Sequence, residues 1–362
     1  MNLFLPRIEI SLSQIQENAK VLSDLYTGKG VSLMGVTKAV LGEPSIAKAM
    51  IQGGVKLIAD SRIENIIRMR NAGVFIPFVL LRTPLSQAES IVENADISLN
   101  TEMETLKKLS YHAKEQNKIH QVIIMVEMGD LREGVMPCDL PQFIKQTLSL
   151  PNIKIIGIGC NLACYGGIKP DDKNMQELSE LVDSLEKEFQ IELKIISGGN
   201  SANYEWFNSC QNVGRINNIR LGESILLGCE TVSRKAIPGL HTGAFQLVAE
   251  VIESKKKPSI PFGEIGQDTF GNIPDFQERG IQQRIIIALG NQDAMPSGLK
   301  FDSKLNLLGS SSDHMILHSH RDNIKAGDEI RVNLKYGGLL STMTSPFVMK
   351  QFADCNGYPT IK

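Results

Sequence analysis

Buried-strand patterns and helical patterns alternate along most of the chain, and this alternation constrains the fold more than any other feature of the sequence. Short apolar runs such as residues 31–36 and 121–127 are typical of strands that are buried on both faces. The segments between such runs, for example residues 174–189, carry apolar residues at a period close to 3.6, which predicts helices. About eight such strand–helix units predict a parallel sheet that closes into a (β/α)8 TIM-type barrel over residues 10–235.

The pattern changes near residue 235, where the helical period stops and strict apolar–polar alternation begins. Residues 245–252 and 329–334 alternate in this way, which is typical of antiparallel strands with one solvated face. We expect an antiparallel β domain over residues 236–362, with residues 1–9 as a candidate strand that pairs into it. No helix is expected among these strands, and segments rich in Gly and Pro such as residues 258–263 are expected to be loops.

Composition excludes several classes of partner. The 362 residues contain 38 Lys and Arg against 40 Asp and Glu, a net charge of −2, so neither nucleic acid nor an anionic membrane is an expected partner. No apolar run reaches the ~18 residues of a membrane span, and the first residues lack the pattern of a signal peptide. The six cysteines form no CxxC pair and no zinc-type spacing, so we assign no metal. These observations predict a cytoplasmic protein that binds a small molecule.

Lys38 lies in the segment Gly-Val-Thr-Lys-Ala-Val-Leu-Gly (residues 35–42), where an apolar run stops and a helix is expected to begin. This places it at the carboxyl end of a central strand, the end of a parallel sheet at which ligands collect. Burial there disfavours the ammonium, lowers the pKa of the amine and makes it a nucleophile that can form a Schiff base with a carbonyl cofactor. From this segment alone, a lysine that reaches solvent from an ordinary strand end is an equally good interpretation.

Three further strand-end segments carry chemistry. Residues 197–203 (Ser-Gly-Gly-Asn-Ser-Ala-Asn) suit a phosphate, because glycines allow close backbone approach and hydroxyls and amides donate, but they also fit an ordinary turn. Residues 220–223 (Arg-Leu-Gly-Glu) place a guanidinium beside a glycine amide, although Arg220 taken alone fits a surface salt bridge better. Residues 127–134 include Arg132, whose planar fork matches a carboxylate, and a solvated charged loop is an equally good alternative.

The order of these segments resembles that of the alanine racemase family. A lysine after the first barrel strand is followed by a Gly-x-x-Arg-x-Gly loop, a Gly-Asn-Ser loop, an Arg-x-Gly loop and a β domain. Members of this family are pyridoxal-phosphate enzymes built as a barrel plus a β domain, a plan shared with the eukaryotic-type ornithine decarboxylases. The resemblance covers essentially the whole chain. The amino-acid sequence is most similar to the ornithine racemase branch in four segments, residues 36–39, 160–167, 197–201 and 343–346.

The resemblance implies a role for each matching residue. Lys38 matches the lysine that forms the Schiff base with pyridoxal 5'-phosphate and acts as one of two racemising bases. Arg220 matches the arginine that faces the pyridine nitrogen, and a permanent cation there keeps this nitrogen unprotonated. Arg132 matches the arginine near the substrate carboxylate and the cofactor oxygen. The remaining cofactor-binding matches are Asn161, in place of the usual ring-stacking histidine, and Asn200. Ser201, Gly222 and Glu223 match the phosphate cradle, the last two through their backbone amides.

The β domain departs from the family pattern at the second base. Alanine racemases bring a tyrosine from the partner subunit's β domain, on a strand that matches residues 260–265 here, and this segment contains no tyrosine. Their Met-Asp pair aligns with Ser312 and Asp313. The candidates for the second base are therefore His314, Ser312 and Tyr336, and Tyr336 is alternatively a phosphate ligand. Asp313 matches the aspartate that holds the distal ammonium in the decarboxylases, and Ser312 leaves more room beside it than methionine does.

The resemblance implies an amino-acid racemase that interconverts L and D enantiomers, of ornithine first or lysine second, by two-base α-proton transfer through an external aldimine. It also implies a head-to-tail homodimer. The alternatives are an alanine or broad-specificity racemase, a decarboxylase and a non-catalytic pyridoxal-phosphate carrier. Decarboxylases pair the pyridine nitrogen with a carboxylate rather than an arginine, and the carriers stop before a β domain, so both are less favoured.

Overall fold

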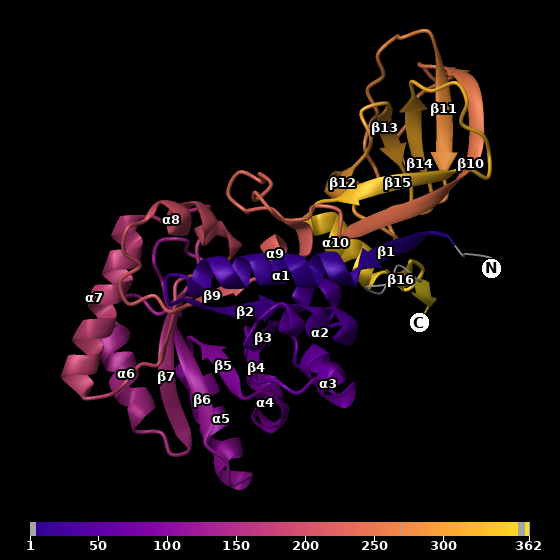
Figure 1. Cartoon of the computed structure of the whole chain (residues 1–362). Helices are drawn as coiled ribbons and strands as arrows, with labels where there is room; N and C mark the ends of the chain where they lie inside the picture. The colour runs from indigo at the N-terminus through magenta and orange to yellow at the C-terminus, as the bar shows by residue number, and fades with distance from the viewer. Residues whose placement is uncertain (1–4, 269, 354–358, 362) are drawn as a thin grey trace. The chain divides into compact units, whose positions relative to one another are not determined.

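The computed structural model describes residues 5–268, 270–353 and 359–361, and the chain forms two compact units (Figure 1). One unit is continuous in sequence and comprises Ser13–Thr242. The other combines Met1–Leu12 with Gly243–Lys362. The predicted fold class, a (β/α)8 barrel with an antiparallel β domain, is confirmed. Within the described part of the chain, every helix is too short or too polar to span a bilayer.

Eight parallel strands close into a barrel in their order along the chain. Each strand pairs with the next and the last pairs with the first, where Arg220 is in register with Met34. The strands are short and mostly buried, as expected for a sheet that is covered on both sides. They are β2 (Ser32–Val36), β3 (Leu57–Asp60), β4 (Phe78–Leu80), β5 (Ile97–Asn100), β6 (His120–Val126), β7 (Ile153–Cys160), β8 (Ile195–Ser197) and β9 (Asn218–Leu221).

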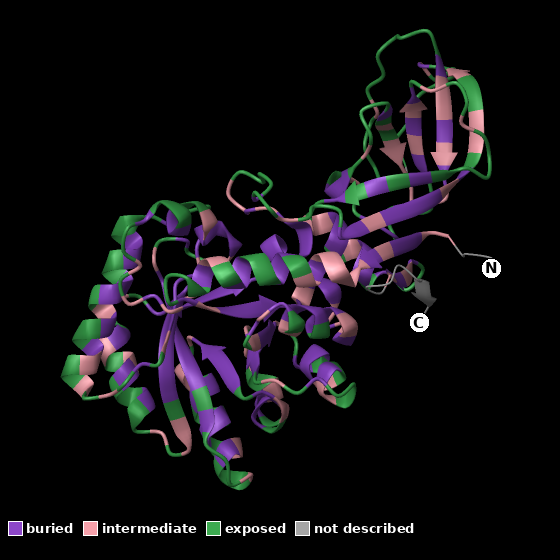
Figure 2. Cartoon of the chain, in the orientation of Figure 1, coloured by how far each residue is buried: buried purple, intermediate pink, exposed green. Residues whose placement is uncertain are grey.

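Helices surround the barrel (Figure 1), and all but the fully buried α9 (Glu223–Leu227) carry both buried and exposed residues (Figure 2). Capping residues set where they begin. Before α7, the Asp171 side chain accepts a hydrogen bond from the backbone of Asn174 at 2.8 Å, and the Asn174 side chain accepts one from the backbone of Asp171 at 3.0 Å. The helices of this unit are α1 (Leu12–Thr27), α2 (Pro44–Gln52), α3 (Ile63–Asn71), α4 (Ala88–Asn94), α5 (Met103–Glu115), α6 (Leu140–Leu148), α7 (Asp172–Phe189), α8 (Tyr204–Ser209) and α9 (Glu223–Leu227).

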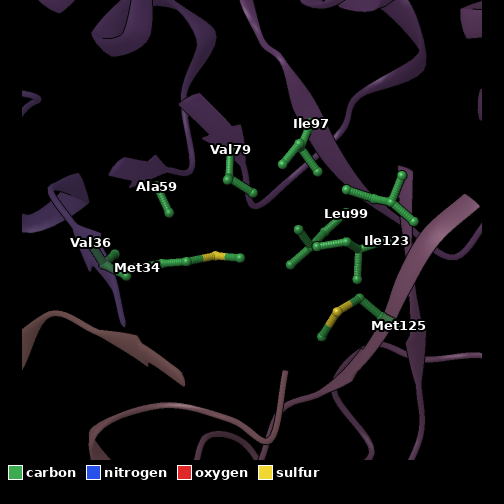
Figure 3. Packing of buried hydrophobic residues seen from close by; sticks show 9 residues of the cluster. Met34, Val36, Ala59, Val79, Ile97, Leu99, Ile123 and Met125 are labelled. Carbon is green, nitrogen blue, oxygen red and sulfur yellow. The ribbon is translucent and has the colours of Figure 1, made fainter. Parts of the chain in front are cut away.

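Apolar side chains from successive strands fill the inside of the barrel (Figure 3). Residues two apart on one strand, such as Met34 and Val36 or Ile97 and Leu99, contribute together because strand side chains alternate between faces. Fully burying a side chain of this size stabilises the fold by ~1.5–3 kcal/mol. The barrel interior is therefore a packed core, and a ligand has to bind where the strands pass into loops, at their carboxyl ends.

The N-terminal strand β1 (Arg7–Ser11) belongs to the sheet of the second unit. It pairs antiparallel with β10 (Phe245–Pro258) and parallel with β16 (Met349–Ala353). Arg7 is buried, and its guanidinium donates to the Glu329 carboxylate on β15 at 2.7 Å. The other strands are β11 (Ile281–Ile287), β12 (Leu299–Lys300), β13 (Leu305–Ser310), β14 (Met315–Ser319), β15 (Glu329–Leu334) and β17 (Pro359–Ile361).

One expectation for the second unit is confirmed and one is wrong. Residues 259–263, expected to belong to a loop, lie in an irregular segment between β10 and β11, and Pro258 is the last residue of β10. A helix, α10 (Tyr336–Thr344), follows β15 although none was expected. Gly298 packs so closely against Gly338 in the first turn of α10 that a Cβ atom on either would overlap the backbone of the other. This backbone contact holds the helix in a segment whose two glycines disfavour it.

Candidate active site

Lys38 is the first residue of a 3-10 turn, η1 (Lys38–Val40), that follows β2 almost directly. The preceding Thr37 is fully buried, and its hydroxyl donates to Asp60 Oδ2 at 2.7 Å. After the turn, Gly42 has a φ of 58°, and a Cβ atom there would lie 2.7 Å from the Asn65 Cβ. The backbone on both sides of Lys38 is therefore fixed, and its side chain starts at the carboxyl end of the barrel.

The surroundings of Lys38 lower the pKa of its ammonium. Burial is the largest cause, and the positive charges of Arg132 and Arg220 act in the same direction. The Cys164 sulfur and the Asp60 carboxylate raise the pKa, but their combined effect is outweighed. These four groups are thus close enough to Lys38 to change its charge state, and the net result is a larger fraction of unprotonated amine.

Arg220 on β9 is buried, and its guanidinium contacts the last residues of β8 and β7. Its Nη1 donates to Ser197 Oγ at 2.6 Å, and its Nη2 donates to the Cys160 carbonyl at 2.7 Å and more weakly to Asn161 Oδ1 at 3.4 Å. Burial lowers the pKa of Arg220 to about 10, so the guanidinium stays charged at neutral pH. Every acceptor found for it among the described residues is a neutral oxygen, and the surface salt bridge considered as an alternative is not formed.

Two asparagines connect the loops that follow β7 and β8. Asn200 Nδ2 donates to Asn161 Oδ1 at 3.1 Å and to the Leu162 carbonyl at 2.8 Å. Asn161 Nδ2 is buried and has no hydrogen-bond partner among the described residues. Leaving such a donor unpaired costs about 1–3 kcal/mol. The free donor of Asn161 is therefore a place at which a bound group is expected to supply an acceptor.

The short helices that follow β8 and β9 contact each other at their starts through serine hydroxyls. Ser201 begins η3 (Ser201–Asn203), and its Oγ lies 3.0 Å from Ser224 Oγ and accepts from the Ser224 amide at 3.2 Å. Gly222 precedes α9, so the amides of Gly222 and Glu223 lie at a helix start, where amides have no intrahelical partner.

The Glu223 side chain is buried and pairs with Arg234. Burial raises the pKa of Glu223, although the pairing with Arg234 opposes the shift. Glu223 can therefore serve an anion only through its backbone.

Arg132 lies in the loop after β6, and its guanidinium already has two partners. It forms a bidentate ion pair with Glu133, the next residue along the chain, and its Nη1 donates to Cys164 Sγ at 2.8 Å. Burial disfavours the charge, but the Glu133 carboxylate outweighs burial and raises the pKa of Arg132. Arg132 is exposed, as the solvated-loop alternative expects, but its charge also lowers the pKa of Lys38.

The remaining predicted residues lie in the second unit. Ser312 Oγ donates to Asp313 Oδ2 at 2.7 Å, and Gln292 donates to the other carboxylate oxygen of Asp313. His314 is exposed and its backbone amide donates to Ser311 Oγ. Tyr336 is half-buried at the start of α10. Ser312, Asp313 and His314 thus form one exposed corner of this unit, and no group of three or more His, Cys, Asp or Glu residues among those described could hold a metal ion.

Residues 10–229 match the family model described as the alanine racemase N-terminal domain. The chain belongs to the alanine racemase family. It is 41% identical over 351 residues to the ornithine racemase of Acetoanaerobium sticklandii and 37% identical over 350 residues to the lysine racemase of Thermotoga maritima. These alignments cover 96% of this chain and 99% and 98% of the two relatives. The alanine racemase of Clostridium difficile 630 shares the fold, with a TM-score of 0.75 at 19% identity over 99% of this chain and 98% of that chain. The protein is an amino-acid racemase.

Around the predicted site residues of this racemase, the structure places side chains that the sequence did not indicate. Ser197 accepts a hydrogen bond from Arg220, and the hydroxyls of Ser201 and Ser224 are hydrogen-bonded to each other. Glu133 and Cys164 both accept hydrogen bonds from the Arg132 guanidinium. Each of these contacts except that of Glu133 joins two segments that are more than twenty residues apart in the sequence. Glu133 could have been found from the sequence, because a carboxylate directly beside an arginine can compete for its guanidinium.

Proposed function

We propose that the protein racemises a diamino acid, ornithine first and lysine second, with pyridoxal 5'-phosphate as its cofactor. The observation that carries this proposal is the buried Arg220, whose acceptors are neutral and whose strand β9 pairs with β2, the strand that leads to Lys38. Two relatives that match nearly the whole chain, an ornithine racemase and a lysine racemase, support the substrate class.

The residues at the carboxyl end of the barrel fit this cofactor. Lys38 offers an amine of lowered pKa as a covalent anchor, and Arg220 offers a cation for the pyridine nitrogen. The unpaired Asn161 Nδ2, held in place by Asn200, offers a donor to a bound ring that carries acceptors. For the phosphate, the suitable groups are the Ser201 hydroxyl and the amides of Gly222 and Glu223.

The side chains of the barrel have separate tasks in the reaction. The cofactor, when bound, withdraws the electron pair that the departing α-proton leaves on the substrate carbon. Lys38 takes or returns this proton on one face of the substrate, and the lowered pKa of its amine makes the unprotonated, proton-accepting form easier to reach. Arg220 cannot release a proton at neutral pH, which favours return of the proton to carbon over protonation elsewhere. Arg132 orients the substrate by binding the substrate's carboxylate.

Racemisation needs a second acid or base on the opposite face. We assign it to the second unit, with His314, Ser312 and Tyr336 as the candidates, and we propose Asp313 as a ligand of the distal ammonium. The active form in this proposal is a cytoplasmic homodimer in which the partner subunit supplies these groups. Full activity of a monomer at high dilution would contradict the dimer.

A screen of single amino-acid enantiomers tests the proposed function. Purified protein with added pyridoxal phosphate is incubated with each L and D amino acid, and the products are separated by chiral chromatography while CO₂ release is recorded. The expected result is interconversion of D- and L-ornithine, a slower reaction with lysine and no CO₂. Release of CO₂ with formation of a diamine would indicate a decarboxylase, and faster conversion of alanine than of ornithine would contradict the substrate class.

A further inference from the structure

Arg132 and Glu133 form a bidentate ion pair at the carboxyl end of the barrel. Their side chains are 35% and 33% exposed, so the pair is neither fully solvated nor sealed from a ligand. Arg132 is the residue proposed to bind the substrate carboxylate. A substrate that takes the Nε and Nη2 donors of this guanidinium has to displace Glu133, because the Glu133 carboxylate accepts from both of them and Nη1 already donates to Cys164.

The backbone around the pair is held firmly. Glu127 Oε1 accepts from the amides of Gly129 and Leu131, at 2.6 and 3.0 Å. Asp130 accepts from the amides of Cys164 and Tyr165 in the loop after β7, at 3.1 and 2.9 Å. These bonds anchor the residues that lead to Arg132 and the facing loop. An exchange of partners at Arg132 therefore needs only side-chain rotation.

Both members of the pair act on the reaction centre through their charges. The Arg132 charge lowers the pKa of Lys38, and the Glu133 charge acts on Arg220, whose pKa it raises against the larger effect of burial. Glu133 therefore acts on two of the cations of the site, Arg132 and Arg220. Because Glu133 follows Arg132 directly in the chain, its carboxylate stays near a substrate whose carboxylate Arg132 binds.

We propose that Glu133 selects diamino acids by exchanging partners, so that the substrate carboxylate takes the Arg132 guanidinium while Glu133 receives the distal ammonium of the substrate. This inference rests on the proposed function. One ion pair in the free protein becomes two in the complex when the substrate carries a distal cation. A substrate with a neutral side chain breaks the Arg132–Glu133 pair and leaves the half-buried Glu133 without a cation, which weakens its binding. An ammonium has three donors, so Asp313 can share it with Glu133.

Binding of two simple acids tests the exchange without relying on turnover. The holoenzyme is titrated calorimetrically with 5-aminopentanoate, which has the carboxylate and distal ammonium of ornithine but no α-amine, and with pentanoate, which has the carboxylate alone. The visible absorption of the cofactor is followed in the same titration to detect covalent reaction of the amine. A hydrogen bond between charged groups is expected to favour 5-aminopentanoate by about ten- to a hundredfold.

Glu133→Gln is expected to remove this preference while leaving pentanoate binding equal or tighter. Glu104→Gln is a matched control, because Glu104 pairs with Lys107 on the exposed surface of α5, and it should leave the preference unchanged. If Glu133→Gln lowers the yield of folded protein, Glu133→Asp keeps the charge and should retain most of the preference. Equal binding of the two acids by the wild type, or an unchanged preference in Glu133→Gln, would overturn the inference.

Kinetics separate a failure of this inference from a failure of the proposed function. The ratio of kcat/KM for ornithine to that for norvaline, its neutral analogue, is expected to fall about ten- to a hundredfold in Glu133→Gln. If the variant racemises both substrates with the wild-type ratio, Glu133 has no role in selection although the enzyme is a racemase. If the wild type racemises neither substrate, the proposed function fails. The preference for 5-aminopentanoate over pentanoate still decides whether Glu133 binds a distal ammonium.

Discussion

The Thr37 hydroxyl donates to Oδ2 of the buried Asp60 at 2.7 Å, and this bond fixes the residue that precedes Lys38. Asp60 also accepts from the Arg62 amide and from Asn65 Nδ2, at 3.0 and 2.9 Å. These three donors favour the charged form of the carboxylate, although burial is the larger effect and raises its pKa. The position of the amine in the barrel mouth therefore depends on a buried polar network beneath it.

Lys38→Ala is expected to abolish racemisation, because the substitution removes both a proton-transfer group and the anchor of the proposed cofactor. In the wild type, borohydride reduction should bleach the visible absorption band and leave the cofactor mass on the peptide that contains Lys38. Peptide mass spectrometry measures the adduct. A stable adduct on another lysine would show that Lys38 is not the anchor.

Arg220→Gln is expected to lower kcat about a hundredfold, because a preorganised charge at the reaction centre is lost. The variant should also release more α-keto acid per turnover, since a protonated pyridine nitrogen allows protonation away from the α-carbon. Ser197→Ala keeps the guanidinium and removes one of its acceptors, so a smaller loss is expected. Keto-acid release equal to that of the wild type would mean that Arg220 has no part in directing the proton.

Asp313→Asn should cost roughly one to two decades in kcat/KM for ornithine and little for alanine, because a charge-assisted hydrogen bond to an ammonium is worth ~1.5–3 kcal/mol. Ser312 and Gln292 both donate to this carboxylate, so the aspartate is already oriented. Steady-state kinetics with both substrates measure the effect. An equal loss for the two substrates would assign Asp313 a structural role.

Acid should weaken the barrel through His120. Burial lowers the pKa of His120 to about 4, and its Nε2 lies 2.8 Å from Ser98 Oγ. The folded state therefore binds this proton less readily than the unfolded chain, whose histidine titrates near 6.5, so stability is full above pH 6.5 and falls as pH drops toward 4. The expected contribution is about 2 kcal/mol between pH 7.5 and 5. Urea unfolding of wild type and His120→Gln at both pH values measures it, and equal losses in the two proteins would contradict it.

Gly290→Ala is expected to destabilise the second unit and to move the predicted site residues in it. A Cβ atom at position 290 would overlap the peptide bond between Ser312 and Asp313. Overpacking of this kind costs about 1–3 kcal/mol. Thermal unfolding measures the loss, and Gly309→Ala serves as the control because nothing lies within 4 Å of the added atom. Equal melting temperatures for the two variants would refute the close contact.

The sequence was sufficient to predict the barrel because its strands are apolar runs with few alternatives. Lys38 and Arg220 became site candidates only through the order of the segments that carry them, because each taken alone also fitted an ordinary surface residue. Helix α10 could not be predicted, since Gly337 and Gly338 disfavour a helix and the contact with Gly298 that holds it is tertiary. The support of Arg220 by Ser197 was missed for a similar reason. The hydrogen bond depends on β8 and β9 being neighbours in the barrel.

Strand β1 has a consequence for synthesis of the protein. It is made before the barrel, but its partners β10 and β16, and Glu329, which pairs with Arg7, are made only after the whole barrel. A nascent chain therefore carries a completed barrel and an unpaired strand edge at the same time, and such an edge can pair with another chain. Slowing elongation after residue 242 should lengthen this interval and increase aggregation of the nascent protein.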